Sequence, residues 1–242
     1  MIYILAPIGG GKTSLTHLLS KELGAREFLE KVDGMPMLKE FYSAGEESRK
    51  ALGFPLQVSF LNFRYSQLRQ ALELKERGIE SIMDSSLLSD SLMYKNIHDR
   101  GETSDAEYNL YLELLENMQA NVSGHPFHGY PDLIIYLDMP FKLMLKHIQH
   151  RGRAMEDITK DPELVGYYHS VWELFNNWAK SYSQSPMLSV DMSKYDYVNN
   201  EEDKNFVLNM IDDKLVSLGL LTPAKKDELL DKRGCREVAL NV

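Results

Sequence analysis

The chain of 242 residues corresponds to roughly one and a half average domains, which permits one large α/β domain or two small ones. Hydrophobic residues make up 43% and charged residues 26%, a composition that favours a folded globular protein with a sizeable core. The 36 acidic residues outnumber the 27 basic ones and give a formal net charge of −9, which argues against a nucleic-acid polymer as partner. Any bound anion must therefore be held by a local site.

Cysteine usage and hydropathy indicate the compartment. The single cysteine, Cys235, excludes an internal disulfide framework and a cysteine-based zinc cluster, and it fits a reducing environment. Neither a secretory leader nor an apolar stretch of about 18 residues is visible. We therefore expect a cytoplasmic protein with no membrane contact.

Short apolar runs alternate with amphipathic segments along the chain. The apolar runs predict buried parallel strands at residues 2–5, 79–83, 133–137 and 187–190, with a fifth, shorter strand at 25–29. Apolar residues at three- and four-residue spacing predict helices over residues 13–23, 56–77, 106–120, 141–150, 161–183 and 201–218. This alternation predicts a doubly wound, five-stranded parallel sheet flanked by helices.

No linker or repeat divides this pattern. We expect one domain over residues 1–221 and a charged tail over residues 222–242, which is open as a terminal helix, a partner contact or a mobile end. His125 and His128 lie in a Gly- and Pro-rich loop with no third ligand nearby, so a solvated loop is favoured over a metal site. Trp172, Phe175 and Trp178 recur at three-residue steps, which favours a core stripe over a ligand platform.

The first predicted strand runs into a glycine-rich turn and then a helix. Residues 6–13 read Ala-Pro-Ile-Gly-Gly-Gly-Lys-Thr. Glycines let backbone N–H groups approach phosphate oxygens, the lysine neutralises the β- and γ-phosphates, and the threonine hydroxyl can ligate Mg²⁺. Because a strand precedes the turn and a helix follows it, we expect a functional phosphate loop. Its nucleotide-binding residues are Gly9, Gly10, Gly11, Lys12, Thr13 and Ser14, with Thr13 also a metal ligand.

Three further motifs follow in order. Glu30 stands in Phe-Leu-Glu-Lys-Val after the second strand, Asp84 in Met-Asp-Ser-Ser at the end of the third, and Arg151 in Arg-Gly-Arg after the helix at 141–150. Over residues 1 to about 221 this order resembles the deoxynucleoside kinase family, and most closely its bacterial deoxyadenosine/deoxyguanosine kinases. The resemblance implies a phosphate-loop kinase fold with a short lid at about residues 151–160.

The resemblance also implies roles for individual residues. Glu30 would be the general base for the 5′-hydroxyl, which is a poor nucleophile until a carboxylate accepts its proton. Asp84 would handle Mg²⁺ at the carboxyl end of a parallel strand. Arg151 and Arg153 would close over the donor phosphates, the cationic clamp that phosphoryl transfer needs.

Other matched residues would hold the acceptor nucleoside. Gln57 and Arg64 are seven residues apart, two helical turns, and so share one face. Gln57 offers both a donor and an acceptor, as a nucleobase edge requires. In the family these two positions read the base, Asp90 approaches the base, and Tyr42 and Glu156 contact the sugar 3′-hydroxyl.

The sequence departs from the family pattern at four positions. Ala6 replaces the first glycine, Ser85 replaces an arginine that reaches the transferring phosphoryl group, His147 stands where an arginine is common, and Met155 replaces an acid. The loss at Ser85 puts the rate in question, because it removes a positive charge where negative charge is largest. The segment 191–198 resembles a family loop that borders the donor adenine, and its aromatic residues are equally open to a packing role.

The function expected is transfer of the γ-phosphate of ATP or another nucleoside triphosphate, with Mg²⁺, to the 5′-hydroxyl of a deoxynucleoside, with a purine favoured. Two alternatives stay open. One is a nucleotide-binding subunit with little turnover, and the other is a nucleoside-monophosphate kinase. By resemblance alone we expect a homodimer or a heterodimer with a related subunit.

Overall fold

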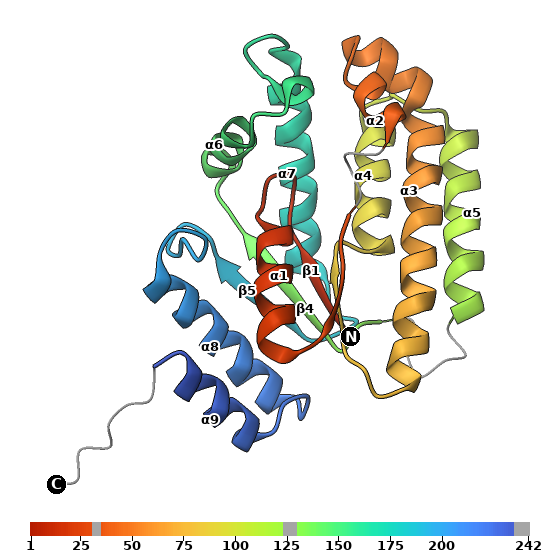
Figure 1. Cartoon of the computed structure of the whole chain (residues 1–242). Coiled ribbons are helices and arrows are strands. Elements are labelled where there is room, and N and C mark those ends of the chain that lie inside the picture. The colour runs from red at the N-terminus through yellow and green to blue at the C-terminus, as the bar shows by residue number, and fades with distance from the viewer. Residues whose placement is uncertain (31–34, 123–129, 235–242) are drawn as a thin grey trace, which may run out of the picture.

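A five-stranded parallel sheet forms the centre of the computed structural model, which describes residues 1–30, 35–122 and 130–234 (Figure 1). Its strands are β1 (Ile2–Leu5), β2 (Arg26–Phe28), β3 (Ser81–Asp84), β4 (Leu133–Asp138) and β5 (Met187–Asp191). They lie in the order β2-β3-β1-β4-β5, and β1 pairs Ile4 with Asp84 on one side and with Ile135 on the other. The predicted doubly wound sheet is confirmed.

The predicted strands are all present, with shifted ends. The third begins at Ser81 and not at Ile79, because the Ile79 N–H donates to the Leu74 carbonyl in the turn that ends the preceding helix. Ile79 itself is 42% exposed. All four residues of β1 are buried, which agrees with the expectation that a continuous apolar run marks a strand covered on both faces.

The helices follow the predicted pattern and add to it. They are α1 (Lys12–Leu23), α2 (Pro36–Phe41), α3 (Gly45–Glu76), α4 (Leu87–Asp99), α5 (Asp105–Val122), α6 (Phe141–Arg151), α7 (Glu163–Ser181), α8 (Glu201–Ser217) and α9 (Pro223–Lys232), with a short 3₁₀ turn, η2 (Ala154–Glu156). Helices α2 and α4 were not predicted. Helix α3 starts eleven residues before the predicted position 56 and runs on through Pro55, which lies on its exposed side.

The helices cover the sheet on both faces and position the site. Helix α1 packs against β1, β2 and β3, whereas α3, α4, α5 and α7 stand side by side as a bundle (Figure 1). The turn between β1 and α1 lies at the carboxyl ends of the parallel strands, which is where open α/β sheets bind ligands. Within the part of the chain that the structure describes, no helix is both long and apolar enough to cross a bilayer.

The beginning of the tail is a helix. Helix α9 packs against α8, and Arg233 just after it donates from Nη1 to Asp212 Oδ2 at 2.6 Å and from Nε to Glu22 Oε2 at 3.0 Å. The terminal-helix alternative therefore holds for Pro223–Lys232. Cys235 and the rest of the tail, His125 and His128, and residues 31–34 lie outside the described residues.

The aromatic stripe of α7 is part of the core, as predicted. Phe175 is 2% exposed, and Trp172 and Trp178 are half-buried against the main cluster of apolar side chains. The indole of Trp172 also donates to the Met139 carbonyl at 2.8 Å.

Candidate active site

The phosphate loop adopts the conformation for which its glycines are needed. Gly9 and Gly11 have φ angles of 73° and 83°, a left-handed region that glycine enters without strain. A Cβ built on Gly10 would lie 2.3 Å from the Cβ of Ala6, so no larger residue fits there. Lys12 opens α1 and donates to the Ala6 carbonyl at 3.4 Å, which places its ammonium group against the loop.

Two side chains from distant elements support this loop. The Tyr197 hydroxyl donates to the Gly11 carbonyl at 2.9 Å, and His147 Nδ1 of α6 lies 3.2 Å from the Gly9 carbonyl oxygen. Tyr197 is 1% exposed. Tyr197 therefore packs against the phosphate loop, and the other role open to the segment 191–198, bordering the donor adenine, stays a prediction. Ser14, a predicted nucleotide-binding residue, lines a surface hollow beside the start of α1 together with Tyr197 and Asn199.

A candidate magnesium site lies where β3 ends beside the loop. Thr13 Oγ1 donates to Asp84 Oδ2 at 2.5 Å, and Asp84 is 1% exposed. The other carboxylate oxygen, Oδ1, is buried and has no hydrogen-bond partner among the described residues, a condition that a cation would relieve. Within those same ranges no group of three or more His, Cys, Asp or Glu side chains gathers around a metal position. The Thr13 hydroxyl and the unpartnered Asp84 oxygen fit Mg²⁺, which takes few protein ligands and completes its shell with phosphate and water.

Arg64 links the carboxylates of the site from behind. It is fully buried, and its Nη2 donates to Glu30 Oε1 at 2.7 Å while Nη1 donates to the Asp84 carbonyl at 3.0 Å. Its Nε lies 3.4 Å from Asp90 Oδ2. Gln67, one turn further along α3, accepts from Arg64 Nη1 at 3.2 Å. Arg64 therefore lies behind the carboxylates of Glu30 and Asp90 and holds them in place.

Asp90 ionises close to neutral pH. It is 5% exposed, and burial raises the pKa of its carboxyl from 3.8 to about 7 against the opposing charge of Arg64. The negative charge of Glu30 adds to the increase. A small change in surroundings can therefore change the protonation of Asp90.

These side chains surround a cavity of about 110 Å³ beside the phosphate loop. The predicted site residues in its wall are Gly9, Lys12, Glu30, Tyr42, Gln57, Asp90, Arg151, Arg153 and Glu156. Residues that the sequence did not single out add apolar surface: Phe41, Phe60, Met93 and Tyr167. Phe175, which the sequence assigned to the core stripe, also lines this cavity. Phe60 and Met93 follow Gln57 and Asp90 by three residues, so helical spacing could have found them. Tyr167 and Phe175 reach the cavity only through the packing of α7.

The arginines of the predicted lid are paired with Glu156. Arg151 donates to Glu156 Oε2 from Nη2 at 2.6 Å and from Nε at 3.1 Å, and Arg153 Nη1 lies 3.6 Å from Glu156 Oε1. Glu156 is 4% exposed. The structure thus brings the predicted phosphate clamp and the predicted sugar-binding acid together.

Ser85 has an unusual backbone. Its φ of 82° is the one positive value at a non-glycine position among the described residues, and its N–H donates to the Ile4 carbonyl at 3.2 Å. Its hydroxyl shares a 2.5 Å hydrogen bond with the Ser89 hydroxyl. Because this conformation is costly for any residue with a Cβ, the chain holds a strained position in the cavity wall.

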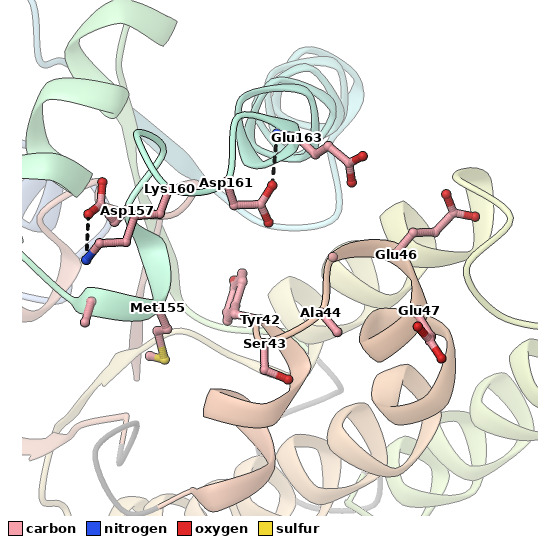
Figure 2. A pocket seen from close by; sticks show the side chains of 12 residues that line it. Tyr42, Ser43, Ala44, Glu46, Glu47, Met155, Asp157, Lys160, Asp161 and Glu163 are labelled. Carbon is pink, nitrogen blue, oxygen red and sulfur yellow. Dashed lines mark hydrogen bonds and ion pairs between the residues drawn. The ribbon is translucent and has the colours of Figure 1, made fainter.

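A larger and more open cavity, of about 560 Å³, adjoins the first. Figure 2 shows Tyr42 and Met155 in its wall, between the start of α3 and the start of α7. Its charged side chains are Glu46, Glu47, Asp157, Lys160, Asp161 and Glu163, and Lys160 pairs with Asp157 at 3.1 Å. Five carboxylates and one lysine would repel a phosphate group. We therefore take the smaller cavity, whose wall contains Lys12, as the candidate active site.

The chain is similar to known proteins in sequence and in fold. The sequence model described as deoxynucleoside kinase matches residues 2–217. The deoxyguanosine kinase of Lactobacillus johnsonii is 38% identical over 219 residues, covering 90% of this chain and 94% of that protein. The deoxyadenosine kinase of Lactobacillus acidophilus is 36% identical over 221 residues, covering 91% and 99%. A solved structure of deoxyadenosine kinase from M. mycoides with bound dATP has a TM-score of 0.67 and 25% identity, covering 87% of this chain and 98% of that one.

Proposed function

Since the chain belongs to the deoxynucleoside kinase family, we propose that it transfers the γ-phosphoryl group of ATP to the 5′-hydroxyl of a purine deoxynucleoside in nucleotide salvage. The observation that carries the proposal is one cavity whose wall holds the phosphate-loop lysine, a carboxylate and polar side chains suited to a base and a sugar. The purine preference is supported by relatives named deoxyguanosine and deoxyadenosine kinases. The alternatives of an inactive subunit and of a monophosphate kinase are not favoured.

We assign the proton transfer to Glu30. Its Oε1 is held by Arg64, so Oε2 is the atom that would take the proton of the 5′-hydroxyl. As the bond from the 5′-oxygen to the γ-phosphorus forms, the bond from that phosphorus to the β,γ-bridging oxygen breaks, and the proton passes to the carboxylate. The products are a deoxynucleoside monophosphate and a nucleoside diphosphate.

The donor phosphates would be held by the phosphate loop and the lid. Lys12 and the N–H groups at the start of α1 would bind the β- and γ-phosphates, and Arg151 and Arg153 would clamp them from the opposite side. Thr13 and Asp84 would hold Mg²⁺, which when bound neutralises phosphate charge and orients the γ-phosphate.

The acceptor base would lie against Gln57 and Asp90, and the sugar against Tyr42 and Glu156. Arg64 would act on the base through Asp90, since its guanidinium is behind that carboxylate. A base edge presents both donors and acceptors, and an amide beside an acid that ionises near neutral pH can match either kind.

We also propose a cytoplasmic enzyme that forms a homodimer or a heterodimer with a related subunit. The single cysteine supports the compartment, and the dimer rests on the family resemblance alone. We propose residues 1–221 as the catalytic domain, residues 151–160 as its lid and residues 222–242 as an appended tail.

One assay tests the proposed function. The purified chain is incubated with ATP and Mg²⁺ against a panel of nucleosides and nucleoside monophosphates, and products are separated by chromatography. We expect deoxyadenosine or deoxyguanosine to give its 5′-monophosphate. Phosphorylation of monophosphates only, or nucleotide binding without any product, would refute the proposal.

A further inference from the structure

Gln67 on α3 joins that helix to the stretch of chain that carries Glu30. It is 8% exposed, and its Nε2 donates to the Leu29 carbonyl at 2.8 Å while its Oε1 accepts from Arg64 Nη1 at 3.2 Å. A guanidinium has only donors and a carbonyl only accepts, so a single orientation of the amide satisfies both neighbours. Both ends of the Gln67 amide are thus engaged by protein groups, and one of these groups is the carbonyl of the residue before the proposed base.

Glu30 depends on such contacts because it lies beyond the end of β2. The register of β2 with β3 ends at the pair Phe28 and Met83, two residues before Glu30. The Glu30 side chain is 26% exposed, so the surrounding atoms do not enclose it fully. A glutamate side chain rotates about several bonds, and only a fixed one keeps its oxygen within reach of the hydroxyl proton. The position of this carboxylate is therefore set by the groups that bond to it and to its backbone.

Arg64 and Gln67 together hold the side chain and the backbone of this segment. Arg64 Nη2 donates to Glu30 Oε1 at 2.7 Å, and Arg64 Nη1 also donates to the Asp84 carbonyl at the end of β3 at 3.0 Å. One turn of α3 therefore bonds to the carboxylate of Glu30 and to the carbonyl of Leu29, and it is anchored to the neighbouring strand. Because a group bonded at one point can still turn about it, the second contact is what fixes a direction.

We infer that Gln67 is a positioning residue for the proton transfer, because it fixes the backbone from which Glu30 extends toward the 5′-hydroxyl. The inference rests on the proposed function and deepens its reaction step. Without the Gln67 amide, Arg64 still bonds to one oxygen of Glu30, but the Leu29 carbonyl loses this donor and the other carboxylate oxygen loses a fixed direction. A displacement of about 1 Å can lower a rate about 100-fold, so the transfer step should be sensitive to this loss while substrate binding is not.

The helix supplies a matched pair of variants. Methionine has nearly the length of glutamine but neither end of the amide, so Gln67→Met removes both hydrogen bonds and adds no charge. Gln70 is exposed three residues further along α3, where its Nε2 contacts Ser66 Oγ at 3.5 Å. Gln70→Met therefore makes the same change on the same helix and leaves both hydrogen bonds of Gln67 in place. Gln67→Glu is a second variant, which keeps the acceptor for Arg64, replaces the donor to Leu29 with an oxygen, and decides the test if Gln67→Met does not fold.

The test measures kcat and the KM values of ATP and deoxynucleoside for each chain, at a temperature below every variant's melting transition. In Gln67→Met we expect kcat to fall about tenfold, with both KM values within about twofold of those of the unsubstituted chain. Gln67→Glu should lower kcat at least as much, and Gln70→Met should retain it. Adding Gln67→Met to a Glu30→Gln chain should have no further effect on kcat, because the base that Gln67 positions is already absent.

The outcomes separate this inference from the proposed function. An unchanged kcat in either Gln67 variant, a rise in KM as large as the fall in kcat, an equal fall in Gln70→Met, or a further fall in the Glu30→Gln chain would each overturn the inference alone. An unsubstituted chain that phosphorylates no deoxynucleoside would overturn the proposed function and this inference together.

Discussion

Replacing Glu30 with glutamine tests the proposed general base most directly. The change keeps the size of the side chain and removes its ability to accept a proton at neutral pH. Arg64 keeps its contacts with Asp90 and with the Asp84 carbonyl, so the buried guanidinium stays paired and the cavity wall stays in place.

The structure sets the size of the two expected effects. Loss of a positioned base lowers kcat by about 100- to 10,000-fold. The bond from Arg64 to Glu30 is 2.7 Å long and charge-assisted, but the Glu30 side chain is 26% exposed, so its loss should destabilise the fold by about 1 kcal/mol. For a chain of this size that corresponds to a melting temperature about 2–4 °C lower.

The assay combines turnover at saturating ATP and deoxynucleoside with calorimetric binding of the deoxynucleoside and a thermal melt. Glu27→Gln is the matched control, since Glu27 lies on β2, three residues before Glu30, and its carboxylate contacts His17 at 2.7 Å outside the cavity. We expect Glu30→Gln to bind the nucleoside with little change while kcat collapses, and Glu27→Gln to retain kcat. A Glu30→Gln enzyme that keeps more than about a third of its kcat would refute the role of Glu30.

Four more predictions concern ionisation, metal, rate and stability. The pKa of Asp90, about 7 when folded, lies above its ordinary 3.8, so its stabilising effect is complete below about pH 4 and is lost as the pH rises through about 7. The melting temperature of Asp90→Asn minus that of the unsubstituted chain should therefore increase between about pH 5 and pH 8, and a flat difference in thermal melts would contradict the raised pKa. Thr13→Ala should raise the Mg²⁺ concentration for half-maximal rate about tenfold, and an unchanged magnesium titration would exclude this ligand. Ser85→Arg should raise kcat about tenfold by adding positive charge near the transferring group, whereas an unchanged kcat in steady-state assays would mean that another residue already supplies it. Glu102→Gln should leave Arg49 and Arg100 without the carboxylate that both contact, and it should destabilise the fold by about 3 kcal/mol. The melting temperature should then be about 6–12 °C lower, and a smaller decrease would show that the two arginines tolerate the loss of this charge.

The three central strands could be predicted from sequence because they are covered on both faces. Apolar runs identified β1, β3, β4 and β5, whereas β2 reads Arg-Glu-Phe, has one buried residue and was expected only as a shorter fifth strand. Helix α4 was missed because its first turn is rich in serine, a weak helix former in isolation. In the structure Ser86 and Ser89 cap that turn reciprocally, each accepting from the backbone N–H of the other. Pro55 likewise concealed the first third of α3, because a proline reads as a helix boundary even where packing carries the helix through it.

In the site, too, sequence spacing predicted which residues share a helix face but not where that face lies in the folded chain. The seven-residue spacing predicted that Gln57 and Arg64 share one face of α3, and in the structure that face is buried. The spacing could not show that Gln57 reaches the cavity while Arg64 lies behind Glu30 and Asp90. That difference depends on the positions of the Glu30 carboxylate after β2 and the Asp90 carboxylate on α4. The place of Tyr167 in the cavity wall was also not predictable, since no sequence motif marks it and it depends on how α7 packs.

The charge balance of the site explains how an acidic chain can bind polyanions. Arg64 is shared between two carboxylates, and Arg151 is occupied by Glu156, so neither presents a bare positive charge to the cavity. Lys12 differs, because its hydrogen bond is to the neutral Ala6 carbonyl and it forms no ion pair within the described ranges. In the proposed function, attraction of the donor phosphates would therefore begin with Lys12 and the N-terminus of α1. In the proposed role, Arg151 and Arg153 would bind phosphate with less net positive charge because each contacts Glu156, so the absence of an arginine at Ser85 would leave the proposed site with little positive charge beyond Lys12.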